Sequence, residues 1–177
     1  MLFRSKAKTT NKGFTLIELL IVIVILAILM AVGLGNFFSS QTKSRDSQRK
    51  TDLQHIAQAL EIYYNDHGEY PTDPGSSTGI AGQEWGDPFV DPDNTTTLYM
   101  NLLPTDPSGY SYYYDSDDGS YFQLYARLEN ENDGSLTKDS DNAVMVYFTT
   151  DCGSGTCNYG IASTNIDPST GHSLISE

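Results

Sequence analysis

One carboxylate, Glu18, lies within a largely apolar run that extends from Phe14 to Phe38. Insertion scales put the cost of an acidic or basic side chain at about 3 kcal/mol at the centre of a membrane helix, and somewhat less toward the interface. A chain that keeps such a charge needs a partner for it. Glu18 also follows the glycine of a Lys12–Gly13 pair by five residues. The chemistry that this carboxylate suggests is charge pairing with a cation.

The two cysteines of the chain, Cys152 and Cys157, enclose a Gly-Ser-Gly-Thr spacer. Two cysteines cannot complete a zinc site without histidines, and none lies close in the sequence. The flexible spacer favours a short-loop disulfide formed in an oxidising compartment, with free thiols as the alternative. A redox-active pair is less favoured, because no Cys-x-x-Cys motif is present.

The apolar run has the length of a membrane helix. Between Phe14 and Val32, every residue except Thr15 and Glu18 is apolar. Four cations and no acids precede Gly13, so the positive-inside rule predicts a single pass through the cytoplasmic membrane with the N-terminus in the cytoplasm: Arg4, Lys6, Lys8 and Lys12. A secretory signal carries its small residues after the apolar region, whereas Gly13 precedes it, so cleavage there would retain the helix.

The segment Lys-Gly-Phe-Thr-Leu-Ile-Glu at residues 12–18 resembles the processing site of type IV prepilins and type II secretion pseudopilins. The resemblance implies that a prepilin peptidase cuts after Gly13 and methylates the new N-terminal amine of Phe14. It also implies that Glu18, fifth in the mature chain, pairs with the Phe14 amine of a neighbouring subunit. A plain signal anchor with a tolerated glutamate is the alternative.

The resemblance implies a filament built from copies of this chain and of other pilins or pseudopilins, assembled by an inner-membrane platform. The subunit would leave the cytoplasmic membrane for a periplasmic or extracellular filament. The corresponding segments are a leader at residues 1–13, a transmembrane and filament-core helix at 14–38, an amphipathic helix at 39–66 and an acidic extracytoplasmic domain at 67–177.

The amphipathic segment at 39–66 begins with a basic band of Lys43, Arg45, Arg49 and Lys50. Apolar residues then recur at helical spacing and predict one buried stripe: Leu53, Ile56, Ala57, Leu60 and Tyr64. Gly68 and Pro71 predict the end of the helix. We assign no chemistry to His55 and His67, which we expect to be solvated, and we place His172 in a mobile tail.

The remaining chain predicts a long loop at residues 72–97, a helical turn near 98–103 and then strands. The runs at 110–114 and 121–125 flank Asp-Ser-Asp-Asp-Gly-Ser and predict a β-hairpin. Further strands are expected at 143–148 and 158–162. The predicted fold class is α+β, with a long N-terminal helix packed against a small antiparallel sheet in a pilin-like fold.

Two loops of this domain resemble those of major pseudopilins. Residues 103–109 are similar to a Leu-Pro-x-Asp-Pro-Trp-Gly segment, with Ser108 in place of the tryptophan. The acids near residue 140 fall where those proteins bind calcium, so the resemblance implies Asp133, Asp139 and Asp141 as candidate calcium ligands. Solvated loop acids are the alternative, because the spacing does not fit an EF-hand. No other cofactor is expected.

The sequence therefore favours a structural filament subunit, most like the major pseudopilin of a type II secretion system. A type IV pilin serving adhesion, motility or DNA uptake and a signal-anchored extracytoplasmic binding domain are the alternatives. Residues 67–177 contain 18 Asp and Glu against Arg127 and Lys138, which argues against nucleic-acid binding. No catalytic triad, phosphate loop or paired catalytic carboxylates are visible, so we expect no enzyme activity.

Overall fold

The computed structural model describes residues 13–177, except for the side chains of residues 32–36 and of Pro74. The predicted leader, apart from Gly13, therefore lies outside the described residues. The chain forms two compact units, of which the first ends at Ser40 and the second runs from Gln41 to Glu177.

One helix, α1 (Leu16–His67), accounts for the predicted pair of helical segments. The helix ends at His67, directly before Gly68, as the sequence predicts. Gly68 has φ of 77°, the left-handed conformation that glycine adopts without a Cβ penalty. Its N–H donates to the Tyr64 carbonyl at 2.7 Å, which satisfies one of the last helical acceptors.

In the first unit, the large apolar side chains of α1 are exposed, from 82% for Leu16 to 46% for Leu26. Within the described part of the chain, we find no helix that combines the length and the apolar character needed to cross a membrane. The predicted transmembrane segment at 14–38 includes residues 32–36, whose side chains are outside the described set.

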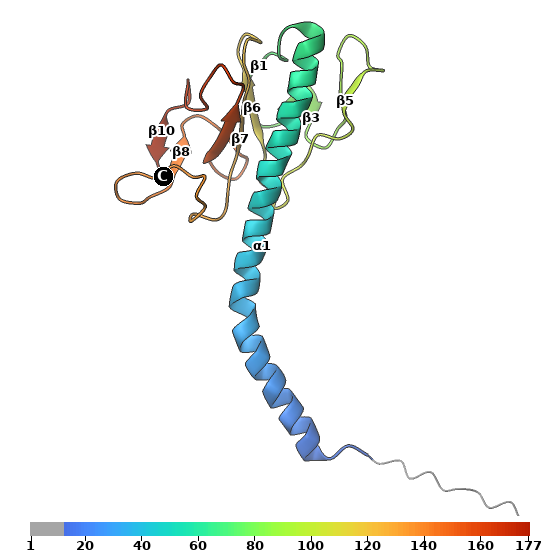
Figure 1. Cartoon of the computed structure of the whole chain (residues 1–177), viewed down its shortest axis with the longest axis vertical. Helices are drawn as coiled ribbons and strands as arrows, with labels where there is room; N and C mark the ends of the chain where they lie inside the picture. Colours follow the sequence, from blue (N-terminus) through green and yellow to red (C-terminus); the bar gives the residue numbers. More distant parts are fainter. Residues whose placement is uncertain (1–12) are drawn as a thin grey trace, which may run out of the picture. The chain divides into compact units, whose positions relative to one another are not determined.

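The second unit contains a four-stranded antiparallel sheet in the order β1-β6-β7-β9 (Figure 1). Its strands are β1 (Asp73–Ser76), β6 (Tyr113–Ser116), β7 (Gln123–Ala126) and β9 (Tyr159–Ala162). The predicted hairpin is confirmed, because β6 pairs with β7 with Asp115 opposite Gln123. The predicted strand at 158–162 is also confirmed as β9 beside β7.

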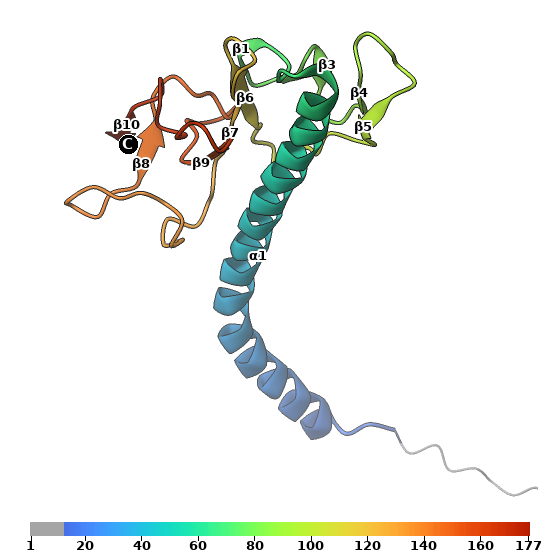
Figure 2. The same ribbon diagram turned by 45° about the horizontal axis from the view of Figure 1, so that its top comes forward.

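Three small two-stranded sheets complete this unit. They pair β2 (Gly79–Ile80) with β3 (Gln83–Glu84), β4 (Phe89–Val90) with β5 (Leu98–Met100), and β8 (Met145–Tyr147) with β10 (Leu174–Ser176). In both views β5 lies on one side of the C-terminal part of α1, and β8 and β10 lie on the other (Figures 1 and 2).

Two secondary-structure predictions were wrong. The helical turn near 98–103 is strand β5, and the loop at 72–97 contains β1 to β4. Asp-Pro-Gly-Ser in β1 holds no β-branched or aromatic residue, so local propensity gives no strand signal. Pairing with β6, about 40 positions later in the chain, makes it a strand.

The core lies between the sheet and one face of α1. Leu53, Ile56 and Leu60 have no exposed surface. The predicted stripe is wrong at its last member, because Tyr63 is 7% exposed and Tyr64 is 40% exposed. Steps of three, four and three residues keep 53, 56, 60 and 63 on one helix face. These side chains pack with buried residues from the strands and loops: Tyr70, Ile80, Phe89, Leu103, Tyr112, Tyr114, Phe122, Leu124 and Ala126.

Candidate assembly site

The first turn of α1 holds the residues that the sequence singled out for processing and pairing. Thr15 precedes the first helical residue and acts as the N-cap. Its backbone N–H donates to Glu18 Oε2 at 2.8 Å, and its hydroxyl donates to the same oxygen at 2.6 Å. The Glu18 N–H donates back to Thr15 Oγ1 at 3.3 Å. This reciprocal arrangement is a capping box, which satisfies helix-end donors that would otherwise lack partners.

The capping box leaves part of the Glu18 carboxylate unused. Both bonds from Thr15 go to Oε2, and Oε1 accepts none from the residues that the structure describes. Glu18 and Phe14 are exposed, the latter to 89%. A Cβ at Gly13 would meet no atom of the described residues within 4 Å, so a side chain there would have open space. The contribution of Thr15 was missed, although the Thr-x-x-Glu spacing carries the signal.

A second cluster lies on α1 just inside the second unit. Arg49 has no exposed surface, and its guanidinium donates to three carboxylates: to Asp46 at 2.7 Å, to Asp106 at 2.6 Å and to Glu129 at 2.7 Å. Asp46 in turn accepts the backbone N–H groups of residues 129 and 130 at 2.9 and 2.8 Å. Arg45 also pairs with Glu129.

The Arg49 cluster joins α1 to two loops of the domain. The hydrogen bond from Arg45, assisted by Arg49, lowers the pKa of Glu129 to about 2. Burial acts against ionisation of Asp106, but its bonds to Arg49 outweigh burial and lower the pKa of that carboxyl. Asp106 and Glu129 are therefore ionised near neutral pH beside Arg45 and Arg49, and buried charges persist only when each is paired and hydrogen-bonded.

The sequence showed only a basic band at these positions. The missed signal is spacing, because Arg49 precedes Leu53 by four residues and so lies on the buried face of α1. Asp106 belongs to the 103–109 segment, and Ser108, which replaces the tryptophan of that motif, accepts a hydrogen bond from Arg49 at 2.6 Å.

The three candidate calcium ligands are not brought into one cluster. Asp133 pairs with Lys50 Nζ at 2.5 Å, and Asp139 accepts a hydrogen bond from Ser176 at 2.7 Å. The backbone N–H of Asp141 also donates to Asp139, at 2.9 Å. Calcium binding at this loop stays a prediction.

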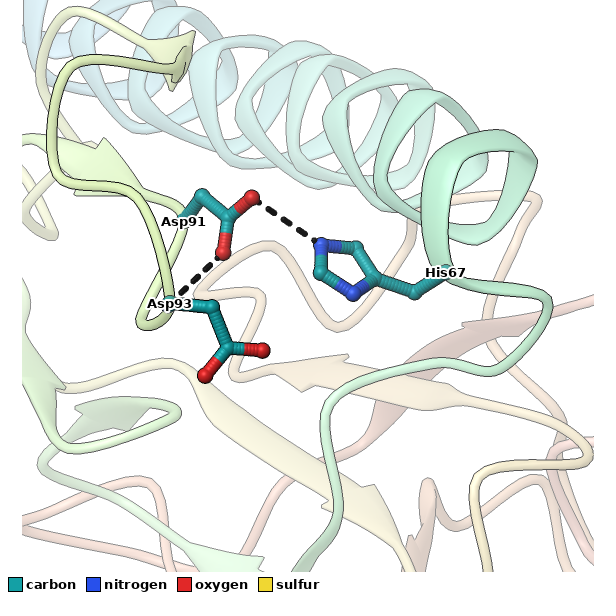
Figure 3. Close-up of side chains that lie close together, drawn as sticks. All are labelled: His67, Asp91 and Asp93. Carbon is teal, nitrogen blue, oxygen red and sulfur yellow. Dashed lines mark hydrogen bonds and ion pairs between the residues drawn. The ribbon is translucent and has the colours of Figure 1, made fainter.

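A different cluster combines metal-ligating side chains, and it includes a histidine for which we expected no role. Among the described residues, one group of three His, Cys, Asp or Glu side chains places its donor atoms within 4.8 Å of one another: His67, Asp91 and Asp93. Figure 3 shows the His67 ring, from the last turn of α1, directed at the Asp91 carboxylate in the loop after β4. Nε2 of His67 lies 3.2 Å from Asp91 Oδ2 and 3.2 Å from the Tyr99 hydroxyl.

His172 is not in a mobile tail, which corrects the prediction. Its side chain is largely buried, with Nε2 2.9 Å from Asp115 Oδ2. Nδ1 lies 3.0 Å from the Thr149 hydroxyl and 3.2 Å from the Phe148 carbonyl. The hydrogen bond to Asp115 raises the pKa of His172. The imidazole thus links the chain before β10 to strand β6.

Cys152 and Cys157 are joined in a disulfide and have no exposed surface. Both pack with Tyr125 and Tyr147 in a small second core. The bridge therefore holds together the loop between β8 and β9.

The arrangement can be compared with known proteins. Residues 8–34 match the family described as "Prokaryotic N-terminal methylation motif", and residues 36–144 match "Type II secretion system (T2SS), protein G". The type II secretion system core protein G of Pseudomonas aeruginosa is 33% identical over 134 residues, covering 74% of this chain and 92% of that protein. The core protein G of Vibrio cholerae is 32% identical over 110 residues, covering 62% and 73%.

A pilin relative matches a shorter stretch. The type IV major pilin protein PilA of Myxococcus xanthus is 36% identical over 77 residues, which cover 44% of this chain and 34% of that protein. No solved structure gives a significant match.

Proposed function

Because the chain belongs to the type II secretion system protein G family, we propose that it is a structural subunit of a type IV pilus-family filament, most like a major pseudopilin that serves protein secretion. The observation that carries this proposal is the order of the two matches. The methylation motif at residues 8–34 leads directly into the protein G domain at 36–144. The family is one of structural subunits, and we propose no catalytic role.

Processing at the N-terminus follows from the motif. A prepilin peptidase would cut after Gly13 and leave Phe14 as the N-methylated first residue. Before assembly, residues 14–38 would span the cytoplasmic membrane as a single pass with the N-terminus in the cytoplasm. The apolar side chains from Leu16 to Met30, which are exposed in the isolated chain, support this placement because only lipid or neighbouring helices can cover them.

Assembly would pair Glu18 with the Phe14 amine of an adjacent subunit. The exposed Glu18 side chain supports this role, because the capping box orients its carboxylate through Oε2. In an apolar filament core the pair fixes register, and removing one partner from a buried pair costs about 3–5 kcal/mol. The apolar helices provide most of the adhesion. Other pseudopilins and an inner-membrane assembly platform are the remaining partners.

A surface pilin is the second candidate. The disulfide between Cys152 and Cys157 favours it, because a bridge near the C-terminus is more typical of pilins proper. The PilA match extends over only 34% of that relative, which weighs against this candidate.

Mass analysis of the N-terminus tests the processing step. We expect a chain that begins at N-methylated Phe14. An intact Met1, or a cut beyond the apolar run, would contradict the filament proposal.

Replacement of Glu18 by Ala tests the pairing. We expect membrane insertion to persist and filament yield to fall strongly, because the buried amine of the neighbour loses its counter-charge. Glu131→Ala, which changes an exposed acid outside the N-terminal turn, is the matched control. Equal filament yields from the two variants would exclude the pairing mechanism.

Deletion of the chain separates the two candidates. Loss of exoprotein export with no loss of surface filaments supports the pseudopilin. The reverse outcome supports the pilin.

A further inference from the structure

The end of α1 and the loop after β4 bring together an imidazole and two carboxylates that no part of the assembly proposal uses. His67 is the last residue of α1, and Asp91 and Asp93 follow β4 directly. We propose that His67, Asp91 and Asp93 form a binding site for a divalent transition-metal ion, with Zn²⁺ as the probe. This site is independent of the N-terminal processing and pairing residues.

The donor types fit such an ion. A neutral imidazole nitrogen suits Zn²⁺, Cu²⁺, Ni²⁺ or Fe²⁺, whereas Ca²⁺ and Mg²⁺ prefer sites made of oxygen alone. Two carboxylates would balance the charge of the ion. Three protein ligands leave one position of a tetrahedral ion open for water.

The distances also fit. Metal–ligand bonds of about 2.0–2.2 Å in a tetrahedron separate neighbouring donor atoms by roughly 3.4 Å. His67 Nε2 and Asp91 Oδ2 are 3.2 Å apart, which is longer than the usual N–H···O distance of about 2.9 Å. The contacts of both groups with the Tyr99 hydroxyl are long as well, at 3.2 Å from His67 Nε2 to that hydroxyl and 3.4 Å from the hydroxyl to Asp91 Oδ2. The hydrogen bonds in the described Arg49 cluster are mostly shorter, at 2.6–3.0 Å.

The site is also built to hold its ligands in place. The His67 ring stacks on Tyr63 at 4.2 Å with an angle of 15° between the planes. Asp91 is 8% exposed and accepts the Asp93 N–H at 2.8 Å through Oδ1, which leaves Oδ2 directed at the imidazole. Fixed orientation of ligating groups by surrounding contacts is typical of metal sites.

The charge around the site is not compensated within the described part of the chain. Asp66, Asp93 and Glu69 form no ion pair with a lysine or arginine there. The Tyr99 hydroxyl donates to Asp91 Oδ2 at 3.4 Å and brings no positive charge to the site. A bound cation would offset this excess of negative charge.

Calorimetric titration of the full, detergent-solubilised chain with ZnCl₂ tests the proposal. The protein carries no polyhistidine tag, and calcium is present in excess to fill oxygen-only sites. We expect one Zn²⁺ per chain and a loss of affinity of about tenfold or more for His67→Gln and for Asp93→Asn. His55→Gln, which changes an exposed histidine of the same helix, should bind as the unmodified chain does.

Two ligand variants, His67→Gln and Asp93→Asn, are used so that misfolding of one of them does not prevent the test. Asp93 is exposed, so Asp93→Asn is expected to fold even if His67→Gln does not. With Co²⁺ in place of Zn²⁺, the visible absorption of the bound ion should also be lost in Asp93→Asn. Absence of Zn²⁺ binding, or equal binding by the unmodified chain and Asp93→Asn, would overturn the proposal.

Discussion

Arg49 shows how much one residue contributes to the second unit. Its guanidinium is fully buried and is neutralised by acids from α1, from the 103–109 segment and from the loop after β7. A buried ion cluster adds little net stability relative to an apolar core, but removing one partner leaves the others charged and unpaired. The cluster therefore acts mainly to fix where these loops attach to the helix.

We predict that Arg49→Met lowers the free energy of unfolding by about 3–5 kcal/mol, because three carboxylates lose their cation. Urea denaturation followed by the fluorescence of Trp85 measures this. Lys43→Met removes an exposed cation of the same helix and should change stability by no more than about 0.5 kcal/mol. Equal urea midpoints for the two variants would show that the Arg49 cluster does not stabilise the folded protein.

At the scale of elements, β10 is held by His172 as well as by its pairing with β8. Acceptors face both ring nitrogens: the Asp115 carboxylate on one side, and the Thr149 hydroxyl and Phe148 carbonyl on the other. An imidazole donates from both nitrogens only when it is protonated. The native state therefore favours the charged form of His172.

The hydrogen bonds of His172 predict that the free energy of unfolding falls as the pH rises. Hydrogen bonding to Asp115 raises the folded pKa of His172 above the unfolded value of about 6.5. The stabilisation is complete below about pH 6.5, and it is lost as the pH rises through the raised folded pKa. We expect the unmodified chain to lose more stability across this range than His172→Gln. Denaturant midpoints at several pH values measure the difference, with His55→Gln as control; parallel curves for His172→Gln and the unmodified chain would contradict the assignment.

The loop between β7 and β8 carries the calcium prediction. If Asp133, Asp139 and Asp141 gather around an ion, calcium at a hundredfold excess over its dissociation constant stabilises the native state by about 2.7 kcal/mol. We expect the melting midpoint to rise by several degrees with Ca²⁺ relative to chelator. The rise should vanish in Asp139→Asn/Asp141→Asn and persist in Asp117→Asn. An identical rise in both variants would place the ion elsewhere.

For the whole molecule, charge is the property that most affects association. The chain has a formal net charge of −13, and cleavage after Gly13, if it removes the four cations before it, would bring the charge to −17. Subunits stacked in a filament would place these acidic domains close together, and like charges repel over a distance set by the salt concentration. The apolar helices must overcome this repulsion.

We predict that isolated filaments dissociate more at 10 mM salt than at 150 mM, because the screening length falls from about 30 Å to about 8 Å. Sedimentation of sheared filaments measures the assembled fraction, with sucrose at matched osmolarity as control. Dissociation that increases with salt would instead indicate that attractive ion pairs between domains hold the filament together.

The sequence alone determined the features that depend on local pattern. Helical spacing and Gly68 indicated α1 and its end, and two aromatic-rich runs around an Asp-Gly turn indicated the β6–β7 hairpin. The motif at residues 12–18 pointed to the family, because a contiguous motif can be read directly from the sequence.

Only the tertiary structure decided which distant residues meet. β1 is a strand because β6 pairs with it, Arg49 is buried because three separate acids neutralise it, and His67 and His172 each face a carboxylate from another element. Helical spacing places Arg49 on the buried face of α1, but it does not indicate which acids from distant segments meet it there. These long-range contacts arise because a buried polar group must find its partner wherever the fold brings one, and that position is set by packing rather than by sequence spacing.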